Sequence, residues 1–508
     1  MMVLTQESDS RSRLDHEWIA SLFLTLLAIL CSKVAITALW NLFFHPLASF
    51  PGPRLAALSN LYQAYYDVYY RGKFVEHLHD LHARYGPVVR VGPNELHFSS
   101  PEAYKDIYHS GSKFVKEKAF YKTMQEEFSS FGTWDPVFHR KRKDTMNPLF
   151  SRRAILKLES SIQEKVDRLI QILLPTREEI DLFCAFRCFS LDVVYDYTFG
   201  EDAGAISYPF FRHPIILGTE GIILNNAIGR HLPIIDRIVS CLPSFIQKRF
   251  TPPGFSEVTQ TLGSRATEFV ERKAKVQQSD ERETIFNRIV DVEDASWKSL
   301  FDEGMNLTFA GTDTVANACI AACFYVHSDA EMLKRLREEL RNAWPDVNSR
   351  VSYEVLEKLP YLTAVIKESL RLSIGVPVGL LREVQPASAQ IMGYEIPRGT
   401  IVSVSATFMH WNPDVFPDPH KFSPKRWLQD RDRKLDSYLV PFSRGPRQCI
   451  GMNLAWCELY LLLGYLFRRV DLKVDGVTHQ DMRNIYFSFV PVLAGGKHLK
   501  GTVKGSLT

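Results

Sequence analysis

The stretch FSRGPRQCIG, residues 442–451, decides the fold of this chain. Two glycines and a proline predict a tight loop, and the loop runs directly into an apolar segment, residues 453–470, that is predicted to be a helix. Cys449 therefore stands just before a helix N-terminus, where the positive end of the helix dipole favours a thiolate. Arg447 adds positive charge two residues earlier. The simpler interpretation is a capped loop with an ordinary buried cysteine.

The composition of the whole chain narrows the classes to which it can belong. Its 508 residues are 45% hydrophobic and 23% charged, which is ordinary for a globular protein and excludes disorder, collagen and coiled coil as descriptions of the whole. The formal net charge is only +3, so nothing indicates a nucleic acid as partner. Eight cysteines without a C-x-x-C pair or a C-x-x-C-H sequence exclude a disulfide framework, a zinc ribbon and a c-type haem attachment site.

A thiolate at the position of Cys449 can ligate a haem iron. The stretch resembles the haem-binding loop of the cytochrome P-450 monooxygenases, whose pattern is F-x-x-G-x-[R/H]-x-C-x-G. All five defined positions match, as Phe442, Gly445, Arg447, Cys449 and Gly451. The resemblance implies that Cys449 is the axial ligand of the iron, that Phe442 shields the sulfur and that Arg447 pairs with a haem propionate.

A second motif, Ala310-Gly311-Thr312-Asp313-Thr314, lies within residues 297–327, which are predicted to form one long helix. A glycine in the middle of a helix costs about 1 kcal/mol relative to alanine, and a buried Asp–Thr pair needs partners. The simplest interpretation is a kink at a packing contact. The motif resembles the family's [A/G]-G-x-[D/E]-T, which implies that Gly311 clears space for dioxygen and that Asp313 and Thr314 deliver protons.

A third set of residues has a structural interpretation. Glu368 and Arg371 are three residues apart and share one face of a predicted helix, which resembles the family's E-x-x-R. Arg426 is the third member, although Lys425 and Trp427 depart from the usual F-x-P-E-R-F. We expect the three charged residues to lock the core behind the cysteine loop.

The basic run His139-Arg140-Lys141-Arg142-Lys143 is commonly a solvated helix face. In the family, a W-x-x-x-R in this region binds a haem propionate. Here His139 replaces the tryptophan and Lys143 replaces the arginine, and we assign both to the propionates. The other basic residues are candidates for docking a reductase.

The N-terminal region predicts a membrane anchor. Residues 1–17 are polar and residues 18–40 are apolar, long enough as a helix (roughly 35 Å) to cross a bilayer. A proline-rich hinge, residues 41–53, leads to the haem-thiolate monooxygenase domain, residues 54–508. A cleaved signal peptide is the alternative, but the apolar run is long for one and the cysteine usage does not suggest secretion. The expected location is the membrane of the endoplasmic reticulum, spanned once, with a cytosolic catalytic domain, although the flanking charges do not decide the orientation.

The remaining sequence predicts a mainly α fold with a minor β region, in one large haem-binding domain of the cytochrome P-450 fold behind the anchor. The predicted elements are helices at 151–174, 181–200 and 354–373, strands within 86–98, short helices broken by prolines in 207–250, and a hairpin at 390–404 that turns near Pro397–Gly399.

The resemblance implies a membrane-anchored monooxygenase that inserts oxygen from O2 into a hydrophobic small molecule by hydroxylation, epoxidation or multistep oxidation. Residues 45–109 look like fungal secondary-metabolism members, nearest to a trichodiene oxygenase-like group, with terpenoid- or polyketide-derived substrates. The implied cofactor is haem b, with NADPH electrons supplied through a separate flavoprotein reductase in the same membrane. We expect the pocket around Phe309 and Ala310, residues 374–378 and residues 487–490, with its entrance in 207–246.

Three alternatives remain open. A haem-thiolate isomerase or dehydratase would work without a reductase, but such members tend to lose the pair Asp313–Thr314. A sterol demethylase typically carries histidine at the position of Asp313. A non-catalytic haem- or lipid-binding membrane protein would be expected to have lost some of the motif residues, whereas Cys449, Glu368 and Arg371 are all present.

Overall fold

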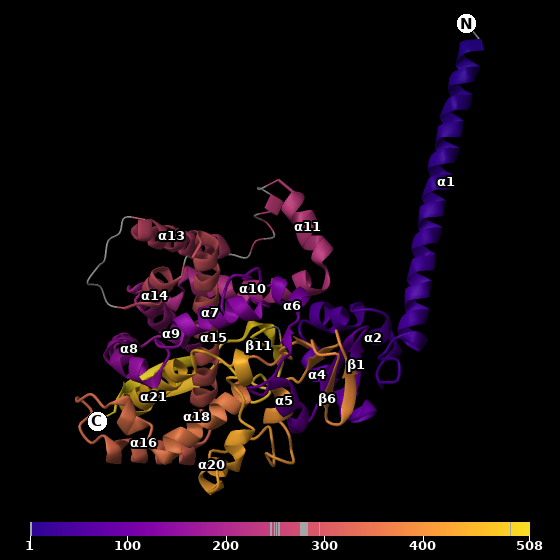
Figure 1. Ribbon diagram of the computed structural model, residues 1–508. Helices are drawn as coiled ribbons and strands as arrows, with labels where there is room; N and C mark the ends of the chain where they lie inside the picture. Colours follow the sequence, from indigo (N-terminus) through magenta and orange to yellow (C-terminus); the bar gives the residue numbers. More distant parts are fainter. Residues whose placement is uncertain are drawn as a thin grey trace.

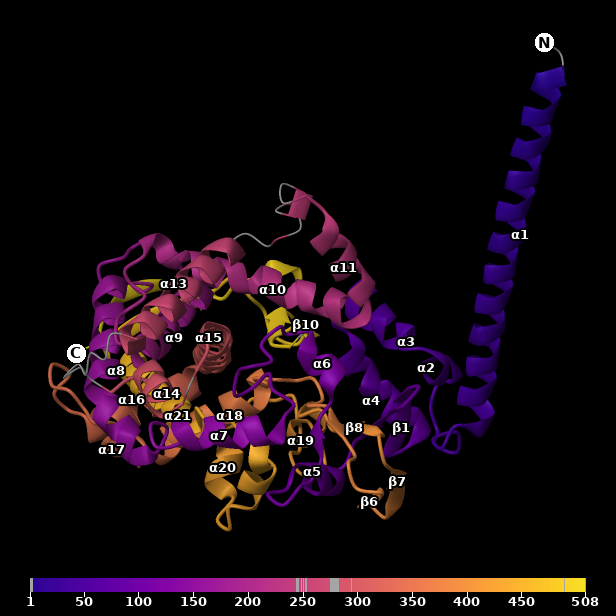
Figure 2. The same ribbon diagram turned by 45° about the horizontal axis from the view of Figure 1, so that its top comes forward.

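A 31-residue helix, α15 (Trp297–His327), runs through the centre of the molecule (Figures 1 and 2). The computed structural model describes residues 3–507, except for 244–245, 248, 250, 252–253, 275–282, 294 and 488. The helix begins at Ser296, whose side chain accepts a hydrogen bond from the N–H of Ser299. Most of its side chains are buried, because helices pack around it on several sides.

The helices predicted on both sides of α15 are present. They are α8 (Arg152–Leu173), α9 (Leu182–Phe199) and α21 (Met452–Arg469). α9 makes the most extensive contact with α15 and is buried along its whole length. The other helices of eight or more residues in the described part of the globular region are α4 (Phe74–Tyr85), α5 (Pro101–Tyr108), α7 (Pro136–Met146), α10 (Pro214–His231), α11 (Pro233–Cys241), α13 (Phe255–Ala274), α14 (Ile285–Val292), α16 (Ala330–Ala343) and α18 (Pro360–Ser373).

Short helices fill the connections. They are α2 (Arg54–Leu58), α3 (Leu61–Ala64), α6 (Lys118–Lys122), α17 (Tyr353–Leu356), α19 (Thr407–His410) and α20 (Lys425–Gln429), with the π-helical or 3-10 turns η1 (Trp40–Phe44), η2 (Tyr65–Tyr69), η3 (Pro209–Phe211), η4 (Lys434–Ser437), η5 (Gly445–Arg447) and η6 (Ala494–Gly496). The predicted helix 354–373 is thus divided, because Pro360 lacks an N–H and starts a new helix, α18, after α17 has ended.

In the described residues, the minor β region forms four small sheets. The largest has the order β1 (Val88–Gly92), β2 (Glu95–Phe98), β8 (Ile401–Ser403), β5 (Arg382–Glu383), β3 (Val115–Lys116). Its β2–β8 pair is parallel and its other pairs are antiparallel. The others are β4 (Ile180–Asp181), β12 (Lys500–Ser506) and β9 (Val470–Asp475) in one sheet, and the pairs β6 (Ser388–Ile391) with β7 (Tyr394–Pro397) and β10 (Ile485–Phe487) with β11 (Pro491–Leu493).

The predicted hairpin at 390–404 is present, but the turn lies elsewhere. β6 and β7 are joined at Met392 and Gly393, both with positive φ (50° and 78°), as a two-residue hairpin turn requires. Pro397–Gly399, where the turn was expected, instead leads from β7 into β8 of the five-stranded sheet. The prediction was wrong because a Pro-x-Gly sequence marks any reversal and does not say which strands it joins.

The two largest hydrophobic clusters of the described residues flank the region where the motifs meet. The larger is formed by α8, α9, α15, α18 and α21, and the smaller by the five-stranded sheet with α4 and α5. The two-core arrangement gives a mainly α fold with a minor β region, as predicted.

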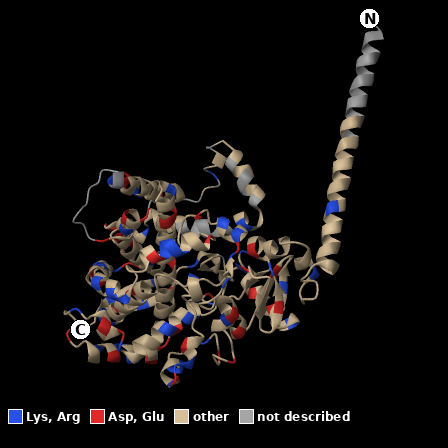
Figure 3. Ribbon diagram, in the orientation of Figure 1, with Lys and Arg blue, Asp and Glu red and all other residues tan. Residues whose placement is uncertain are grey.

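The N-terminal helix stands apart from the rest. α1 (Val3–Leu39) extends away from the globular part in both views (Figures 1 and 2). Its stretch from Ser21 through the adjoining π-helical turn to Phe44 is apolar enough to cross a membrane, with a mean hydropathy of 2.3 and none of that window buried. The described side chains of α1 are almost free of charge (Figure 3). The helix begins before the apolar run, within the residues taken as a polar N-terminus.

Candidate active site

The motifs meet at a cavity of about 820 Å³ beside α15. The cavity is bounded by α15, the segment after α18, the cysteine loop and the end of β10. Its apolar lining includes Phe309, Ala310, Val376, Phe489 and Val490, all from segments that the sequence predicted to line the pocket. Val239 and Gln247 extend the lining into and just beyond the predicted entrance region.

The cysteine loop is shaped by backbone conformations that few residues adopt. Ser443 and Gly445 have positive φ values of 56° and 77°. A Cβ atom on Gly445 would lie 2.5 Å from the carbonyl oxygen of Tyr108, so only glycine fits there. The N–H of Cys449 donates to the oxygen of Phe442 at 2.9 Å, which closes the loop just before α21 begins.

The thiol of Cys449 is exposed toward the cavity that it lines, while protein surrounds it on the other sides. Burial raises the pKa of the Cys449 thiol, and the N–H of Gly451 and the charge of Lys143 act in the opposite direction. Lys143 extends over the loop, where its Nζ donates to the oxygen of Pro446 at 2.8 Å. A bound metal ion would deprotonate such a thiol outright.

The sequence analysis predicted that the positive charge of Arg447 acts on the thiol, and the structure corrects this prediction. The guanidinium of Arg447 donates to the carbonyl oxygen of Thr133 at 3.0 Å. Arg447 is not among the charges that shift the pKa of Cys449, whereas Lys143 lowers that pKa. Arg447 stands two residues away in the sequence, but the charge that acts on the thiol is that of Lys143, from α7.

A cluster of cations lies near the loop: Lys116, Arg447 and Lys143 line the cavity together with His139, and Arg382 lies beside Lys116. Burial and Arg382 lower the pKa of Arg447 to about 10, and burial with these two arginines holds that of Lys116 well below its usual value. Burial and the neighbouring cations lower the pKa of His139 to about 3. Buried cations that repel one another need anions, and the two carboxylates of a haem fit this donor set.

Lys116 and Arg382 were missed by the sequence analysis. They are directly paired across strands β3 and β5, although 266 positions separate them. Lys116 also lies over the rings of Tyr121 and Phe131, at 3.9 and 3.7 Å from their centroids. No local motif marks either residue; the long-range strand pairing brings Arg382 beside Lys116, which lines the cavity.

Arg142 was counted with a solvated basic face, and this was wrong. Its side chain is buried, where Nη1 donates to Glu303 at 2.8 Å and Nε donates to Glu293 at 3.2 Å. A third donor, Nη2, reaches Ser299 at 2.7 Å. Arg142 therefore fastens α7 to the N-terminal half of α15.

Asp313 borders the cavity but is almost fully buried, and it is paired with an arginine from α9. Nε of Arg187 donates to Oδ1 of Asp313 at 2.6 Å, and Nη2 of Arg187 donates to Oδ1 of Asn317 at 2.9 Å. Both members of the ion pair are 2% exposed. Arg187 is a partner that sequence analysis did not identify, because it lies 126 residues away on another helix.

Thr314 and Gly311 lie on the same turn of α15 but face different surroundings. Oγ1 of Thr314 donates to the carbonyl oxygen of Ala310 at 2.9 Å, and the side chain lines the cavity. A Cβ on Gly311 would lie 2.9 Å from Cγ2 of Val194 on α9. The glycine therefore permits close packing of the two helices. A side chain at this position would point toward α9, whereas the sequence analysis expected its absence to make space for dioxygen.

The charged triad is present behind the loop. Arg371 donates to both carboxylate oxygens of Glu368 at 2.9 and 2.8 Å, and Nε of Arg426 donates to Oε1 at 3.1 Å. Arg371 also donates to the backbone oxygen of His410 at 2.8 Å, and the imidazole of His410 accepts the N–H of Val440 at 2.8 Å. This chain of bonds connects α18 to the segment that enters the cysteine loop.

Trp427, which departs from the usual phenylalanine, donates a hydrogen bond to the charged triad. Its indole Nε1 donates to Oε2 of Glu368 at 2.8 Å. The buried carboxylate thus gains a fourth side-chain donor, and the N–H of Ser423 adds a backbone donor at 2.9 Å. A charged group without exposure needs each of its lone pairs satisfied.

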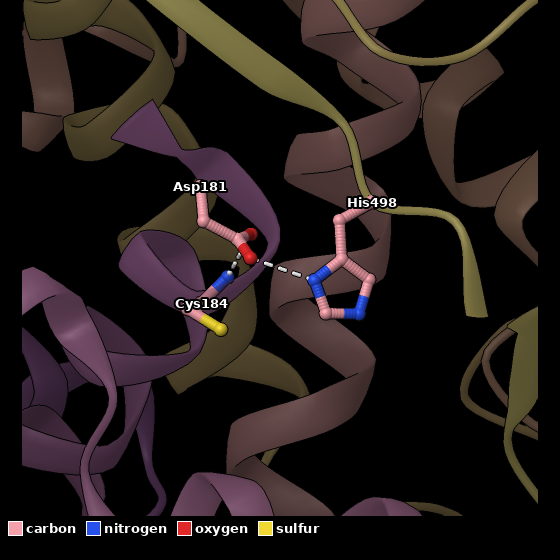
Figure 4. A group of neighbouring side chains, drawn as sticks. All are labelled: Asp181, Cys184 and His498. Atoms are coloured by element: carbon pink, nitrogen blue, oxygen red, sulfur yellow. Dashed lines mark hydrogen bonds and ion pairs between the residues drawn. The ribbon is translucent and has the colours of Figure 1, made fainter. Parts of the chain in front are cut away.

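One other group combines side chains that metals favour, namely Asp181, Cys184 and His498 (Figure 4). One oxygen of Asp181 accepts the N–H of Cys184 at 3.0 Å, which caps α9, and the other lies 2.7 Å from Nδ1 of His498. The carboxylate is thereby engaged in joining the C-terminal strand region to the start of α9. We interpret the group as a structural connection.

Comparison with known proteins agrees with this geometry. A profile of the cytochrome P450 family matches residues 51–493. The chain belongs to the cytochrome P450 family. Because the profile spans most of the chain, the predicted family and fold are confirmed.

Characterised relatives of this cytochrome P450 come from fungi. The cytochrome P450 monooxygenase macH of Penicillium terrestre is 33% identical, over 88% of this chain and 91% of its own. The N-acetyltryptophan 6-hydroxylase ivoC of Emericella nidulans is 33% identical, over 93% and 94%. The cytochrome P450 monooxygenase TRI4 of Fusarium sporotrichioides is 31% identical, over 92% and 94%. The resemblance to fungal secondary-metabolism members is therefore confirmed.

This cytochrome P450 is an oxidoreductase of the monooxygenase type. The family uses haem, takes electrons from a redox partner, and transfers oxygen from O2 to a small molecule. The cavity and its cation cluster fit that cofactor.

Proposed function

We propose that this cytochrome P450 is a membrane-anchored monooxygenase of a fungal secondary-metabolite pathway. It oxidises a hydrophobic small molecule, terpenoid or polyketide derived, by hydroxylation, epoxidation or multistep oxidation. The observation that carries the proposal is that Cys449 and the Asp313–Thr314 pair, from distant segments, line one largely apolar cavity. An isomerase or dehydratase would need the cysteine loop but not the acid–alcohol pair.

Haem b is the proposed cofactor, held without a covalent thioether bond. When bound, it supplies the iron at which O2 is activated with electrons from the redox partner. Cys449 is the proposed axial ligand, with Phe442 packed beside Trp456 near the loop, where the two ring centroids lie 6.1 Å apart. The proposed propionate partners are Arg447, His139 and Lys143 from the sequence, with Lys116 and Arg382 added by the structure.

Proton delivery is the proposed task of Thr314 and Asp313. The hydroxyl of Thr314 lines the cavity and is positioned by the carbonyl of Ala310. Asp313 is held by Arg187, so its carboxylate must exchange that contact before it can pass a proton to the cavity. The buried pair keeps an acid close to the reaction without leaving an uncompensated charge there.

The proposed source of electrons is NADPH, through a separate flavoprotein reductase in the same membrane. The proposed location is the endoplasmic reticulum, with α1 as a single span and the catalytic domain in the cytosol. Apolar side chains exposed on η1 and α11 support contact with lipid on the side of the globular part near α1 (Figures 1 and 2): Phe43, Phe44, Ile234, Ile235 and Ile238.

The decisive experiment is the difference spectrum of the reduced CO complex. Purified protein is expected to show the band of thiolate-ligated haem, and Cys449→Ser is expected to lose it. Cys241→Ser, which changes an exposed cysteine on α11, is the matched control and should leave the band unchanged. A histidine-type spectrum in the native protein would overturn the assignment of Cys449.

The catalytic part is tested by adding a fungal reductase, NADPH and terpene or polyketide scaffolds, with 18O2 as the label. An oxygenated product that carries the label supports the monooxygenase. Conversion that needs neither reductase nor O2 would favour the isomerase or dehydratase. For the anchor, deletion of residues 1–44 is expected to release the protein from membranes on alkaline extraction, whereas the full chain stays in the pellet.

A further inference from the structure

One wall of the cavity is polar, and it carries a carboxyl group that has no protein partner. Glu126 lies in the connection between α6 and α7 and lines the cavity together with Asn306 of α15. Its side chain is partly buried and makes no hydrogen bond or ion pair with the residues that the structure describes. We call Glu126 and Asn306 the polar wall. A carboxyl group that lines a cavity without a hydrogen-bond partner from the protein is available to pair with a ligand.

The position of Glu126 is fixed by the helix that it faces. The N–H of Ser130 donates to Glu303 at 2.7 Å, and the N–H of Phe128 donates to Asp302 at 3.1 Å, so two acids of α15 hold the loop. A Cβ on Gly132 would lie 1.9 Å from the carbonyl oxygen of Glu126, which shows how tightly the loop folds on itself. The carboxyl is therefore presented to the cavity by a preorganised loop.

The charged residues near Glu126 are engaged with other groups. Glu303 is neutralised by Arg142, and Asp302 by Lys298, whose Nζ lies 2.5 Å away. Burial first, and then Asp302 and Glu303, raise the pKa of Glu126 well above its usual value, against the opposing charges of Lys298 and Lys116. Lys116 belongs to the cation cluster that suits the haem carboxylates.

The amide of Asn306 adds an acceptor to the same wall. Its Nδ2 donates to Oε1 of Glu303 at 3.0 Å, and because a carboxylate only accepts, this contact fixes which end of the amide points inward. The amide oxygen has no donor among the described residues. The wall thus offers a carboxyl and a carbonyl oxygen, while Lys298, which also lines the cavity, is paired with Asp302.

We propose that the polar wall recognises a basic nitrogen, so that the substrate of this cytochrome P450 is an apolar molecule carrying an ammonium group. The ammonium pairs with Glu126 and can donate a hydrogen bond to Asn306, while the apolar remainder fills the cavity beside Phe309. This rests on the proposed function for the oxidation step and narrows its substrate class. It favours amine-bearing products over neutral terpenes and polyketides.

The test uses the haem-loaded full chain in detergent and two probes of the same shape. Trimethyl(2-phenylethyl)ammonium carries a quaternary nitrogen, and (3,3-dimethylbutyl)benzene carries a carbon at that position. A quaternary nitrogen has no lone pair and cannot bind iron, so the Soret shift reports only occupation of the cavity. Calorimetric titration gives the affinity independently of the haem spectrum.

Glu126→Gln, which keeps the shape and removes the charge, is expected to weaken binding of the ammonium probe by about tenfold or more and to leave the neutral probe unchanged. Glu127→Gln, a matched change one residue along and outside the cavity lining, should alter neither. Because binding the cation favours the ionised carboxyl, affinity for the ammonium probe should rise with pH in the native protein, and this rise should disappear in Glu126→Gln.

Equal weakening of both probes, no change in Glu126→Gln, or the same loss in Glu127→Gln would overturn the proposal. Failure of the proposed function is separable, because an abnormal reduced CO spectrum would count against the haem-thiolate assignment while calorimetry would still report the preference of the cavity for the cation. A normal spectrum without a charge preference would count against the polar wall alone.

Discussion

Nε of Arg187 lies 2.6 Å from Oδ1 of Asp313, so the acid expected to deliver protons is fastened to α9 inside the protein. Both residues are 2% exposed, and the arginine fork also reaches Asn317. A buried pair of this kind contributes little net stability while intact, but breaking it leaves a charge in a medium that solvates it poorly.

Arg187→Met is therefore expected to lower stability by about 3–5 kcal/mol, because the buried carboxylate of Asp313 loses the guanidinium charge that faces it. The double variant Arg187→Met with Asp313→Asn should lose clearly less than the sum of the two single changes, since neither charge then remains. The measurement is the unfolding midpoint of the detergent-solubilised protein in a double-mutant cycle. Additive losses would mean that the two side chains do not interact as the structure shows.

Thr314→Ala is expected to reduce product formed per O2 consumed by about a hundredfold, the low end of general-acid effects. The missing oxygen should appear as hydrogen peroxide. Thr312→Ala is the matched control, because Oγ1 of Thr312 makes the same bond to the carbonyl four residues earlier, at 2.6 Å, but is buried away from the cavity. Equal coupling in Thr314→Ala and the native protein would remove Thr314 from proton delivery.

Gly311→Ala separates the packing role from a role in oxygen binding. The added methyl would lie 2.9 Å from Val194, and overpacking of this kind costs about 1–3 kcal/mol. Val194→Ala in the same chain should restore most of the lost stability and the yield of haem-loaded protein. If the double variant stays as impaired as Gly311→Ala, contact with α9 is not the reason for the glycine.

The cation cluster can be tested through haem retention. Lys116→Met removes one of the buried cations, so the protein should lose haem faster, by about tenfold if one charge-assisted bond of roughly 1.5 kcal/mol is lost. Haem loss is followed by transfer to apomyoglobin. Lys118→Met, on the exposed side of α6, is the control and should retain haem normally. If Lys116→Met retains haem as well as the native protein, Lys116 does not bind a propionate, and the remaining candidates are Arg382, Arg447 and Lys143.

Local patterns were sufficient for the parts of this protein that adjoin one another in the chain. The cysteine loop, the helix after it and the long helix with Asp313 and Thr314 follow from spacing and turn residues within about 30 positions. The family resemblance then predicted which distant motifs meet. Arg426, for example, was placed beside Glu368 correctly, although 58 positions separate them.

Partners supplied by tertiary packing could not be found in this way. Arg187 reaches Asp313 because α9 and α15 pack closely at Gly311, and Lys116 reaches the cavity because its strand pairs with Arg382. Arg142 looked like part of a solvated basic face until its glutamate partners on other elements were visible. A charge in a sequence does not reveal whether its compensating charge lies in solvent or in the core.

Trp427 provides the last test, because it departs from the usual phenylalanine. Trp427→Phe removes the indole donor to the buried carboxylate of Glu368, and a hydrogen bond to a charged group is worth about 1.5–3 kcal/mol. Trp411→Phe is the matched control, since the buried Nε1 of Trp411 has no hydrogen-bond partner and its loss should cost clearly less. The unfolding midpoints of the two variants decide the matter. If Trp427→Phe is as stable as the native protein, the remaining donors satisfy Glu368 and the tryptophan is a packing residue; if it falls below Trp411→Phe, the departure strengthens the triad behind the cysteine loop.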